Sequence, residues 1–203
     1  MPDIANHRVR KLEQPALDQL FLEAHTQRQW LDRPLSDAVL KEAYDLARMA
    51  PTSANCQPLR IHFVRSAAAK ERLRPCLSKS NLQQTMTAPA TAIFAADVEF
   101  YEFLPKLYPQ ADAKSWFTGS EAAIRGTAEM NAALQAGYFI LAARSLGLDV
   151  GPMAGFDRAK TDQAFFAGNT WKSLFLCNLG YGDPTGHRPR NPRLDFVEAC
   201  RID

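Results

Sequence analysis

The spacing of apolar residues along the chain predicts several helices. Apolar side chains recur every three or four positions, which places them on one face of a helix. The clearest start lies at Ser36 and Asp37, because both side chains can accept a hydrogen bond from a first helical turn, and Pro51 ends that helix. The predicted helices cover residues 14–26, 37–50, 67–76, 121–148 and 157–167.

The helix predicted over residues 121–148 carries apolar residues on most of its sides. A helix of that kind is buried against other elements. Gly147 can adopt the left-handed conformation that ends many helices. This segment is therefore expected to be the long central helix of the fold.

Three further apolar segments predict strands. Residues 60–65 alternate between apolar and polar side chains, whereas residues 90–96 and 173–181 are continuous apolar runs typical of buried strands. Residues 100–110 are rich in aromatics and contain two prolines, which excludes one regular helix and favours a capping loop or lid. Residues 151–156 predict a tight turn.

The order of these elements predicts the fold class. Helices come first, strands and helices then follow without a regular βαβ repeat, and the chain beyond Gly182 is predicted to be extended. The length of 203 residues suits one domain with a substantial core. We therefore expect an α+β fold in a single domain over residues 1–203. The first ten residues are polar and are expected to be frayed.

Charge and composition argue against several partners. The net charge is only +2, whereas nucleic-acid binding requires a clustered basic face. The amino terminus lacks the apolar core of a signal peptide, and no apolar run reaches the ~20 residues that span a membrane. We therefore expect a cytoplasmic protein with neither nucleic-acid nor membrane partners.

Metal and thiol chemistry find little support in the sequence. No two cysteines have the short spacing of a zinc or redox motif, so no metal site is expected. Buried cysteines commonly act as small hydrophobic residues. Cys56 stays a candidate thiol, because it falls within the loop considered next. The cysteines are Cys56, Cys76, Cys177 and Cys200.

Residues 51–58 form a polar segment between a predicted helix and a predicted strand. Thr52, Ser53, Asn55 and Gln57 can each donate and accept hydrogen bonds, and the prolines at both ends restrict the backbone. An ordinary polar surface loop is one interpretation. The alternative is a loop that grips the edge of a planar heterocycle.

This loop carries a family resemblance. Residues 50–58, APTSANCQP, resemble the A-P-S-S-x-N-x-Q-P signature of FMN-dependent nitroreductases. In that family the loop contacts the flavin ring and the ribityl chain. The resemblance implies flavin contacts by Pro51, Thr52, Ser53, Asn55 and Gln57.

Two further segments, one before this loop and one after it, also resemble the family. The segment HTQRQW is similar to the family's R-S-x-R-x-F, which binds the FMN phosphate, and implies ligands at Thr26 and Arg28. His25 replaces the usual arginine, and a neutral histidine is a weaker phosphate partner than a guanidinium. In NLQQ, Asn81 and Gln84 match positions that bond the pyrimidine edge of the flavin; a polar helix surface is the alternative.

Two segments nearer the carboxyl end extend the resemblance. The segment VGPMAGFD resembles the family's G-x-x-P-x-x-G-F-D turn, which implies that the backbone of Ala154 and Gly155 faces flavin N5. A helix-capping turn is compatible with the same residues. The tail over residues 188–198 resembles the C-terminal R-x-P-x-x-E-x-V element, whose arginine reaches the FMN phosphate. Arg193 is the first candidate and Arg190 the second.

The resemblance runs in family order from residue 20 to residue 198. It implies a mixed sheet flanked by helices, with a long central helix and an extended C-terminal tail. It also implies a homodimer that holds FMN between its subunits, with residues 128–146 at the two-fold interface. Flavin N5 would carry the hydride that NADPH or NADH supplies, so no catalytic side chain is expected.

One branch of the family is especially similar. Several segments, among them residues 100–109 and 162–169, look like those of malonic semialdehyde reductases. That resemblance implies reduction of malonic semialdehyde to 3-hydroxypropionate in pyrimidine nitrogen degradation. Two alternatives stay open: a broad-specificity NAD(P)H nitroreductase or quinone reductase, and a non-catalytic flavin-binding dimer.

Other enzyme classes lack their motifs in this chain. Gly180 and Gly182 follow a predicted strand but open no helix, which excludes the usual dinucleotide-binding motif, and no P-loop sequence occurs. No G-x-S-x-G segment is present, and Cys56 has no histidine with a convincing orienting partner. The histidines are scattered at His7, His25, His62 and His187.

Overall fold

A computed structural model describes residues 10–203 of the chain. The expected fraying of the amino terminus and the position of His7 concern residues 1–9, which lie outside the described residues. No helix in the described part is both long and apolar enough to cross a membrane.

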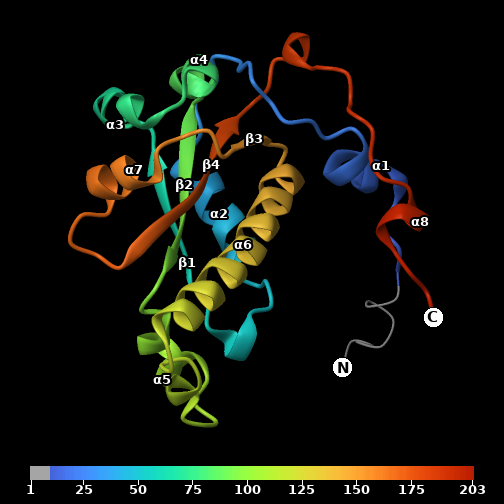
Figure 1. Cartoon of the computed structure of the whole chain (residues 1–203). Helices are drawn as coiled ribbons and strands as arrows, with labels where there is room; N and C mark the ends of the chain where they lie inside the picture. The colour runs from blue at the N-terminus through green and yellow to red at the C-terminus, as the bar shows by residue number, and fades with distance from the viewer. Residues whose placement is uncertain (1–9) are drawn as a thin grey trace.

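Four strands form one sheet in the order β1-β2-β4-β3 (Figure 1). All neighbouring strands pair antiparallel, so the four-stranded sheet is not mixed. Parallel pairing is found among residues 10–203 only as an isolated bridge between Thr26 and Val150. The α+β class is confirmed. The strands are β1 (Leu59–Val64), β2 (Ala90–Asp97), β3 (Asp149–Met153) and β4 (Trp171–Gly180).

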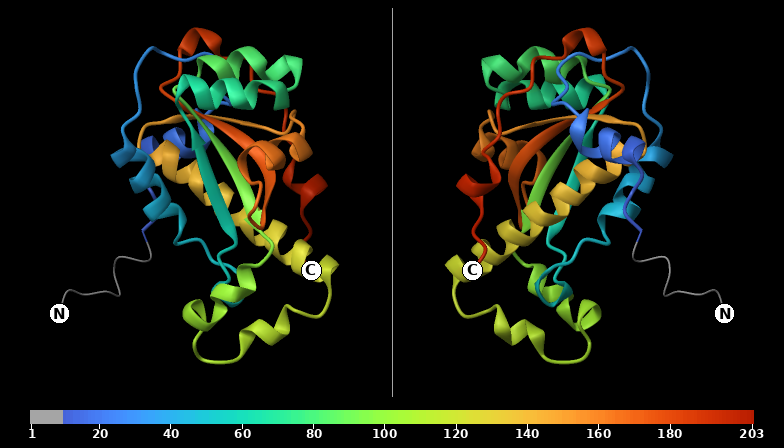
Figure 2. Two further views of the ribbon diagram at one scale, coloured as in Figure 1. Left: turned by 90° about the vertical axis from the view of Figure 1, so that its left-hand side faces the viewer. Right: turned by 90° about the vertical axis from the view of Figure 1, so that its right-hand side faces the viewer.

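Helices cover both faces of this sheet (Figures 1 and 2). One face packs against α2 (Asp37–Ala47) and α6 (Glu121–Ser145), and the other against α3 (Ala67–Leu73) and α7 (Arg158–Phe165). The remaining helical elements lie at the edges and ends. They are α1 (Gln14–Leu17), η2 (Asp18–Leu22), η3 (Ser53–Asn55), η4 (Arg74–Cys76), α4 (Lys79–Thr87), η5 (Phe100–Phe103), α5 (Leu104–Leu107), η6 (Ala113–Trp116), η7 (Pro184–Gly186) and α8 (Phe196–Ala199).

Strand β2 is buried along its whole length because it contributes to both cores. Successive side chains of a strand point to opposite faces. Ala92 and Phe94 therefore pack toward α2 and α6, whereas Ile93 and Ala95 pack toward α3 and α7. This two-sided burial explains the continuous apolar run and confirms the predicted buried strand.

Local capping fixes the helix starts that the sequence predicted. The hydroxyl of Ser36 accepts a hydrogen bond from the N–H of Val39 over 3.2 Å, and α2 begins at the next residue, Asp37. The central helix is confirmed as α6, although it ends at Ser145. Gly147 follows with φ +75°, a left-handed conformation that suits glycine.

Two predictions of local structure were wrong. The helix predicted over residues 14–26 ends at Leu22, because the next residues leave the helix to pair with β3. Residues 151–153, predicted as part of a tight turn, belong to β3 and pair with β4. Residues 100–107 form two short helical turns rather than one helix, as their prolines predicted.

Two apolar surfaces have no cover in the single chain. On α6, Met130, Leu134 and Tyr138 are spaced four residues apart and are 56%, 49% and 43% exposed. The tail from residue 187 onward is exposed throughout, including Leu194 and Val197. Figure 1 shows this tail and α8 standing apart from the sheet, near α1. Exposed apolar surfaces of this kind mark contact sites.

Candidate functional site

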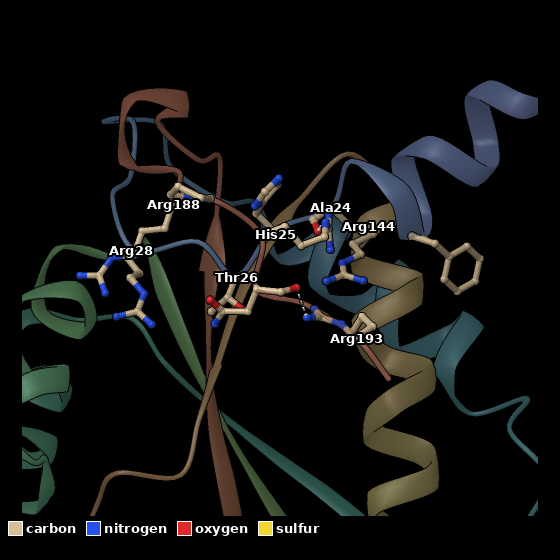
Figure 3. A pocket seen from close by; sticks show the side chains of 11 residues that line it. Ala24, His25, Thr26, Arg28, Arg144, Arg188 and Arg193 are labelled. Carbon is tan, nitrogen blue, oxygen red and sulfur yellow. Dashed lines mark hydrogen bonds between the residues drawn. The ribbon is translucent and has the colours of Figure 1, made fainter. Parts of the chain in front are cut away.

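A cavity of about 480 Å³ lies between the amino-terminal segment, the end of α6 and the C-terminal tail (Figure 3). We call it the arginine cavity, because five arginines and no carboxylate line it. Guanidinium groups gathered without acidic partners repel one another, and a bound anion would offset that repulsion. The lining residues are Phe21, Ala24, His25, Thr26, Arg28, Arg144, Arg188, Pro189, Arg190, Asn191 and Arg193.

Pairing with β3 brings the amino-terminal segment to this cavity. Thr26 bridges Val150, and the N–H of Gln27 donates to the Val150 carbonyl over 2.9 Å. Side chains alternate in extended backbone. Gln27 is therefore buried, whereas Thr26 and Arg28 line the cavity.

The buried Gln27 also fixes the start of the tail. Its Nε2 donates to the Asp183 carbonyl over 3.2 Å, and its Oε1 accepts from the N–H of Arg28 over 2.9 Å. A Cβ on Gly182 would lie 1.9 Å from Gln27 Nε2, so this contact requires glycine. The two ends of the chain are thereby held together beside the cavity.

Neutral carbonyl groups accept hydrogen bonds from three of the guanidiniums, and Arg193 donates to the carbonyls of Asn191 and Pro192 over 2.8 and 3.1 Å. Arg144 donates to the carbonyl of Leu20 over 2.9 Å, and Arg190 donates to those of Leu22 and Ala24 over 2.7 and 2.8 Å. Burial lowers the pKa of Arg144, and the nearby charge of Arg190 acts in the same direction. Because carbonyl groups do not neutralise a guanidinium, this positive charge remains available to an anion.

His25 lines the same cavity and stacks on His187. The ring centroids are 4.7 Å apart and the planes differ by 14°. Burial lowers the pKa of His25, and the positive charge of Arg190 lowers it further. These effects disfavour the charged form of His25, so the positive charge of the cavity comes from the five arginines.

A second group of sequence-predicted residues joins α4 to the turn after β3. The Nδ2 of Asn81 donates to the Gly155 carbonyl over 2.9 Å, and the Nε2 of Gln84 donates to Asn81 Oδ1 over 2.7 Å. A Cβ on Gly155 would lie 2.6 Å from Asn81 Nδ2 and 2.8 Å from Ser78 Oγ. Glycine at this position thus permits close contact with α4. Ala154, next to it, is exposed.

The loop over residues 51–58 has a distorted backbone held from several sides. Ala54, Asn55 and Gln57 have φ values of 47°, 51° and 40°, in the left-handed region. Non-glycine residues in this region cost free energy and cluster at functional sites. The N–H of Gln57 donates to Thr52 Oγ1 over 3.2 Å, and Gln57 Nε2 donates to Asn55 Oδ1 over 2.8 Å.

Two buried amides of α6 anchor this loop and the strand after it. Asn131 Oδ1 accepts from the N–H of Ser53 over 2.8 Å, and Gln135 Oε1 accepts from the N–H of Leu59 over 3.0 Å. The side chain of Asn55 donates to the Leu107 carbonyl over 2.9 Å. The loop therefore lies beside the amino-terminal half of α6.

Within one chain the loop over residues 51–58 lies apart from the predicted residues of the arginine cavity. Arg144, which lines the arginine cavity, lies thirteen residues beyond Asn131 on α6. That interval corresponds to about 20 Å of helix. Residues 51–58 therefore do not share a cavity with Thr26, Arg28 and Arg193 in the single chain. Figure 1 shows the loop near the lower end of the sheet, and the tail to the right, beside α1.

Comparison with known proteins identifies the family. The sequence profile described as the Nitroreductase family matches residues 22–181. The chain belongs to the nitroreductase family. It is 56% identical over 192 residues to a Burkholderia lata protein, covering 95% of this chain and 98% of that protein. A Ralstonia nicotianae protein is 53% identical over 191 residues, with 94% and 98% covered. Both carry the provisional name NADH dehydrogenase/NAD(P)H nitroreductase.

Solved structures share the nitroreductase fold. A nitroreductase-like protein of Bacillus subtilis superimposes with a TM-score of 0.85 at 20% identity, covering 94% of this chain and all of that chain. An Exiguobacterium sibiricum protein, solved in complex with FMN, gives a TM-score of 0.82 at 18% identity, with 95% and 99% covered. At these identities the likeness shows the fold alone.

Sequence reasoning missed several residues of this candidate site. Arg144 and Arg188 line the arginine cavity, and Asn131 anchors the loop over residues 51–58. Arg144 lies at the end of an apolar helix, where the usual interpretation is interaction with the helix dipole. Asn131 did carry a signal, because a buried polar residue on an apolar helix face needs a hydrogen-bond partner.

Cys56 is a packed thiol rather than a reactive one. It is fully buried, and burial raises its pKa to about 11. Nucleophilic cysteines need a lowered pKa and partial exposure. The structure therefore favours the interpretation of Cys56 as a small core residue.

Proposed function

We propose that this protein is an FMN-dependent NAD(P)H oxidoreductase that works as a homodimer with FMN between its subunits. The observation that carries the proposal is the carboxylate-free arginine cavity, built from both ends of the chain. A phosphate monoester carries −1.5 to −2 charges and three acceptor oxygens, which suits clustered guanidiniums. In this role Thr26, Arg28 and Arg193 bind the FMN phosphate, and Arg190 is a second C-terminal candidate.

The flavin ring would extend from this cavity toward α4. Asn81 and Gln84 present amide groups for the pyrimidine edge, and Ala154 and Gly155 offer backbone groups near flavin N5. Their mutual hydrogen bonds fix these side chains before a ligand arrives, which lowers the ordering cost of binding.

The second copy of the chain would supply residues 51–58. This loop lies about 20 Å along α6 from the arginine cavity, so Pro51, Thr52, Ser53, Asn55 and Gln57 of the same chain are too distant. The exposed line of Met130, Leu134 and Tyr138 and the exposed tail provide apolar surface for a two-fold interface. The relatives' names and the FMN-bound neighbour support the same proposal.

When bound, FMN supplies the hydride-transfer chemistry. The chain's own residues bind the phosphate, orient the ring and exclude water from its surface. No side chain is assigned as a nucleophile, in agreement with the raised pKa of the Cys56 thiol.

Malonic semialdehyde is the substrate that we propose, with 3-hydroxypropionate as the product. This finer assignment is supported by the resemblance of residues 100–109 and 162–169 to malonic semialdehyde reductases. The relatives' names point to a broader NAD(P)H nitroreductase, which is the second candidate. NADPH consumption accelerated by malonic semialdehyde but not by nitroaromatics would support the first, and the reverse pattern would support the second.

The visible spectrum of the purified protein tests the central proposal. A flavin spectrum that NADPH bleaches under anaerobic conditions is expected. Arg28→Ala should weaken FMN binding more than riboflavin binding, because only FMN carries the phosphate. A colourless protein that takes up neither flavin on reconstitution would refute the proposal.

A further inference from the structure

Two residues of the arginine cavity also line a neighbouring cavity. Arg28 and Arg188 border both the arginine cavity and a second space of about 390 Å³, which we call the α4 cavity. Ser80, Gln83 and Gln84 of α4 form another side of this space. Figure 3 shows Arg28 and Arg188 together, away from Arg144 and Arg193. The arginines are therefore divided between two adjoining spaces.

The number of guanidiniums exceeds what one phosphate needs. A phosphate monoester with its −1.5 to −2 charges is balanced by about two arginines, and this cavity has five. Arg28 and Arg193, which we assign to the FMN phosphate, already supply that charge, and Arg190 lies in the same cavity. Arg188 is left without an assigned anion, and Arg28 stands at the boundary between the two cavities.

We propose that Arg188, with Arg28 at the boundary, forms a second phosphate subsite that receives a phosphate group of the dinucleotide hydride donor. This inference rests on the proposed function, because it requires a bound flavin to which the donor transfers hydride. The ligand proposed for the α4 cavity is therefore a phosphate group other than that of FMN.

The position of the α4 cavity favours a dinucleotide. Gln84 lies on its wall and is also proposed to meet the pyrimidine edge of the flavin. A nicotinamide stacked on that flavin would bring the rest of its dinucleotide past α4. The chain has no glycine-rich dinucleotide motif of its own, so the donor's phosphates need another cationic contact.

One carboxylate also borders this cavity, and its hydrogen bonds are partly satisfied within the chain. Asp183 Oδ1 accepts from the N–H and the hydroxyl of Thr185 over 2.9 and 2.7 Å. Two guanidiniums and one carboxylate leave the α4 cavity with net positive charge. Ser80 and Gln83 add neutral donors, which suits a phosphate next to a ribose.

Steady-state kinetics of the FMN-loaded enzyme test this subsite. Arg188→Gln should raise the KM for NADPH about tenfold, leave kcat within twofold and leave FMN stoichiometry unchanged. Arg188→Lys should recover part of the loss. Arg74→Gln, which removes another exposed guanidinium outside both cavities, should match the natural enzyme. The KM for NADPH should also rise with salt more steeply in the natural enzyme than in Arg188→Gln.

The outcomes separate the phosphate groups from each other and from the proposed function. A tenfold loss for NADPH with NADH unchanged assigns Arg188 to the 2′-phosphate, and equal losses for both donors assign it to the diphosphate. An unchanged KM for both donors, or a loss of FMN instead, would overturn the subsite. If the natural protein holds FMN but oxidises neither donor, the proposed function itself fails.

Discussion

The N–H of Ser53 donates a hydrogen bond to Oδ1 of Asn131 over 2.8 Å, between residues 78 positions apart in the chain. Asn131 is buried in α6, and its Nδ2 donates to the Thr127 carbonyl over 2.9 Å. The loop that it holds contains three residues in the left-handed region, Ala54, Asn55 and Gln57. Such a backbone persists only where its surroundings impose it. Asn131 therefore helps to hold the loop over residues 51–58 in this conformation.

Asn131→Ala should weaken flavin binding although this residue is not proposed to touch the flavin. Loss of the amide removes its hydrogen bonds to the N–H of Ser53 and to the Thr127 carbonyl, which costs about 1–2 kcal/mol of folding stability. The loop can then relax, so FMN affinity should fall about tenfold or more. Urea denaturation and fluorescence titration with FMN measure the two effects.

Gln135→Ala is the matched control for that variant. It removes a similar hydrogen bond, but to Leu59 at the start of β1 rather than to the loop. Its stability should fall by a comparable amount, with a smaller loss of FMN affinity. Equal losses of affinity in the two variants would show that Asn131 acts through general stability alone.

Sequence patterns predicted the elements that local rules determine. β2 was predicted because an apolar run after Pro89 can satisfy both cores, and the start of α2 because the Ser36 hydroxyl caps it. The end of α6 followed from the conformational freedom of Gly147. In each case, the pattern that predicts the element lies in residues close together in the sequence.

Long-range pairing decided the elements that were predicted wrongly. Residues 23–26 have helical spacing, yet Thr26 pairs with Val150, a residue that local periodicity cannot reveal. The same strand pairing converts residues 151–153 from the predicted turn into β3. The position of Arg144 in the arginine cavity likewise depends on where the C-terminal tail lies. The residues next to Arg144 in α6 therefore do not predict this role.

Thiol reagents should distinguish the cysteines by burial. Burial raises the pKa of Cys56 to about 11, which leaves roughly 0.03% thiolate at pH 7.5. Cys177 is also buried with a raised pKa, whereas Cys200 is exposed. Iodoacetamide followed by peptide mass spectrometry should modify Cys200 within minutes and leave Cys56 intact. Cys56→Ser should retain nearly full turnover; rapid alkylation of Cys56, or an inactive variant, would restore the reactive-thiol hypothesis.

Stability should decrease on acidification through the pH range of histidine. Burial, with a smaller contribution from Arg72, lowers the pKa of His62 below 6.5. Between that lowered pKa and 6.5 the unfolded chain binds more protons than the folded one, so stability is full above pH 6.5 and falls below it. His62→Gln should flatten this part of the profile. Urea midpoints of both proteins between pH 5 and 8 measure it, and parallel profiles would show that His62 does not contribute.

Leu134→Glu should separate the proposed dimer and release the flavin. Leu134 is 49% exposed between Met130 and Tyr138 on α6, so a charge there costs little in the monomer but would bury a charge from each copy in the proposed interface. Size-exclusion chromatography with light scattering should show a folded monomer, and its FMN stoichiometry should fall because residues 51–58 of the second copy are lost. Leu31→Glu, at an apolar residue of similar exposure away from α6, should remain dimeric and yellow. A monomeric Leu134→Glu variant that retains full FMN would mean that one chain completes the site by itself.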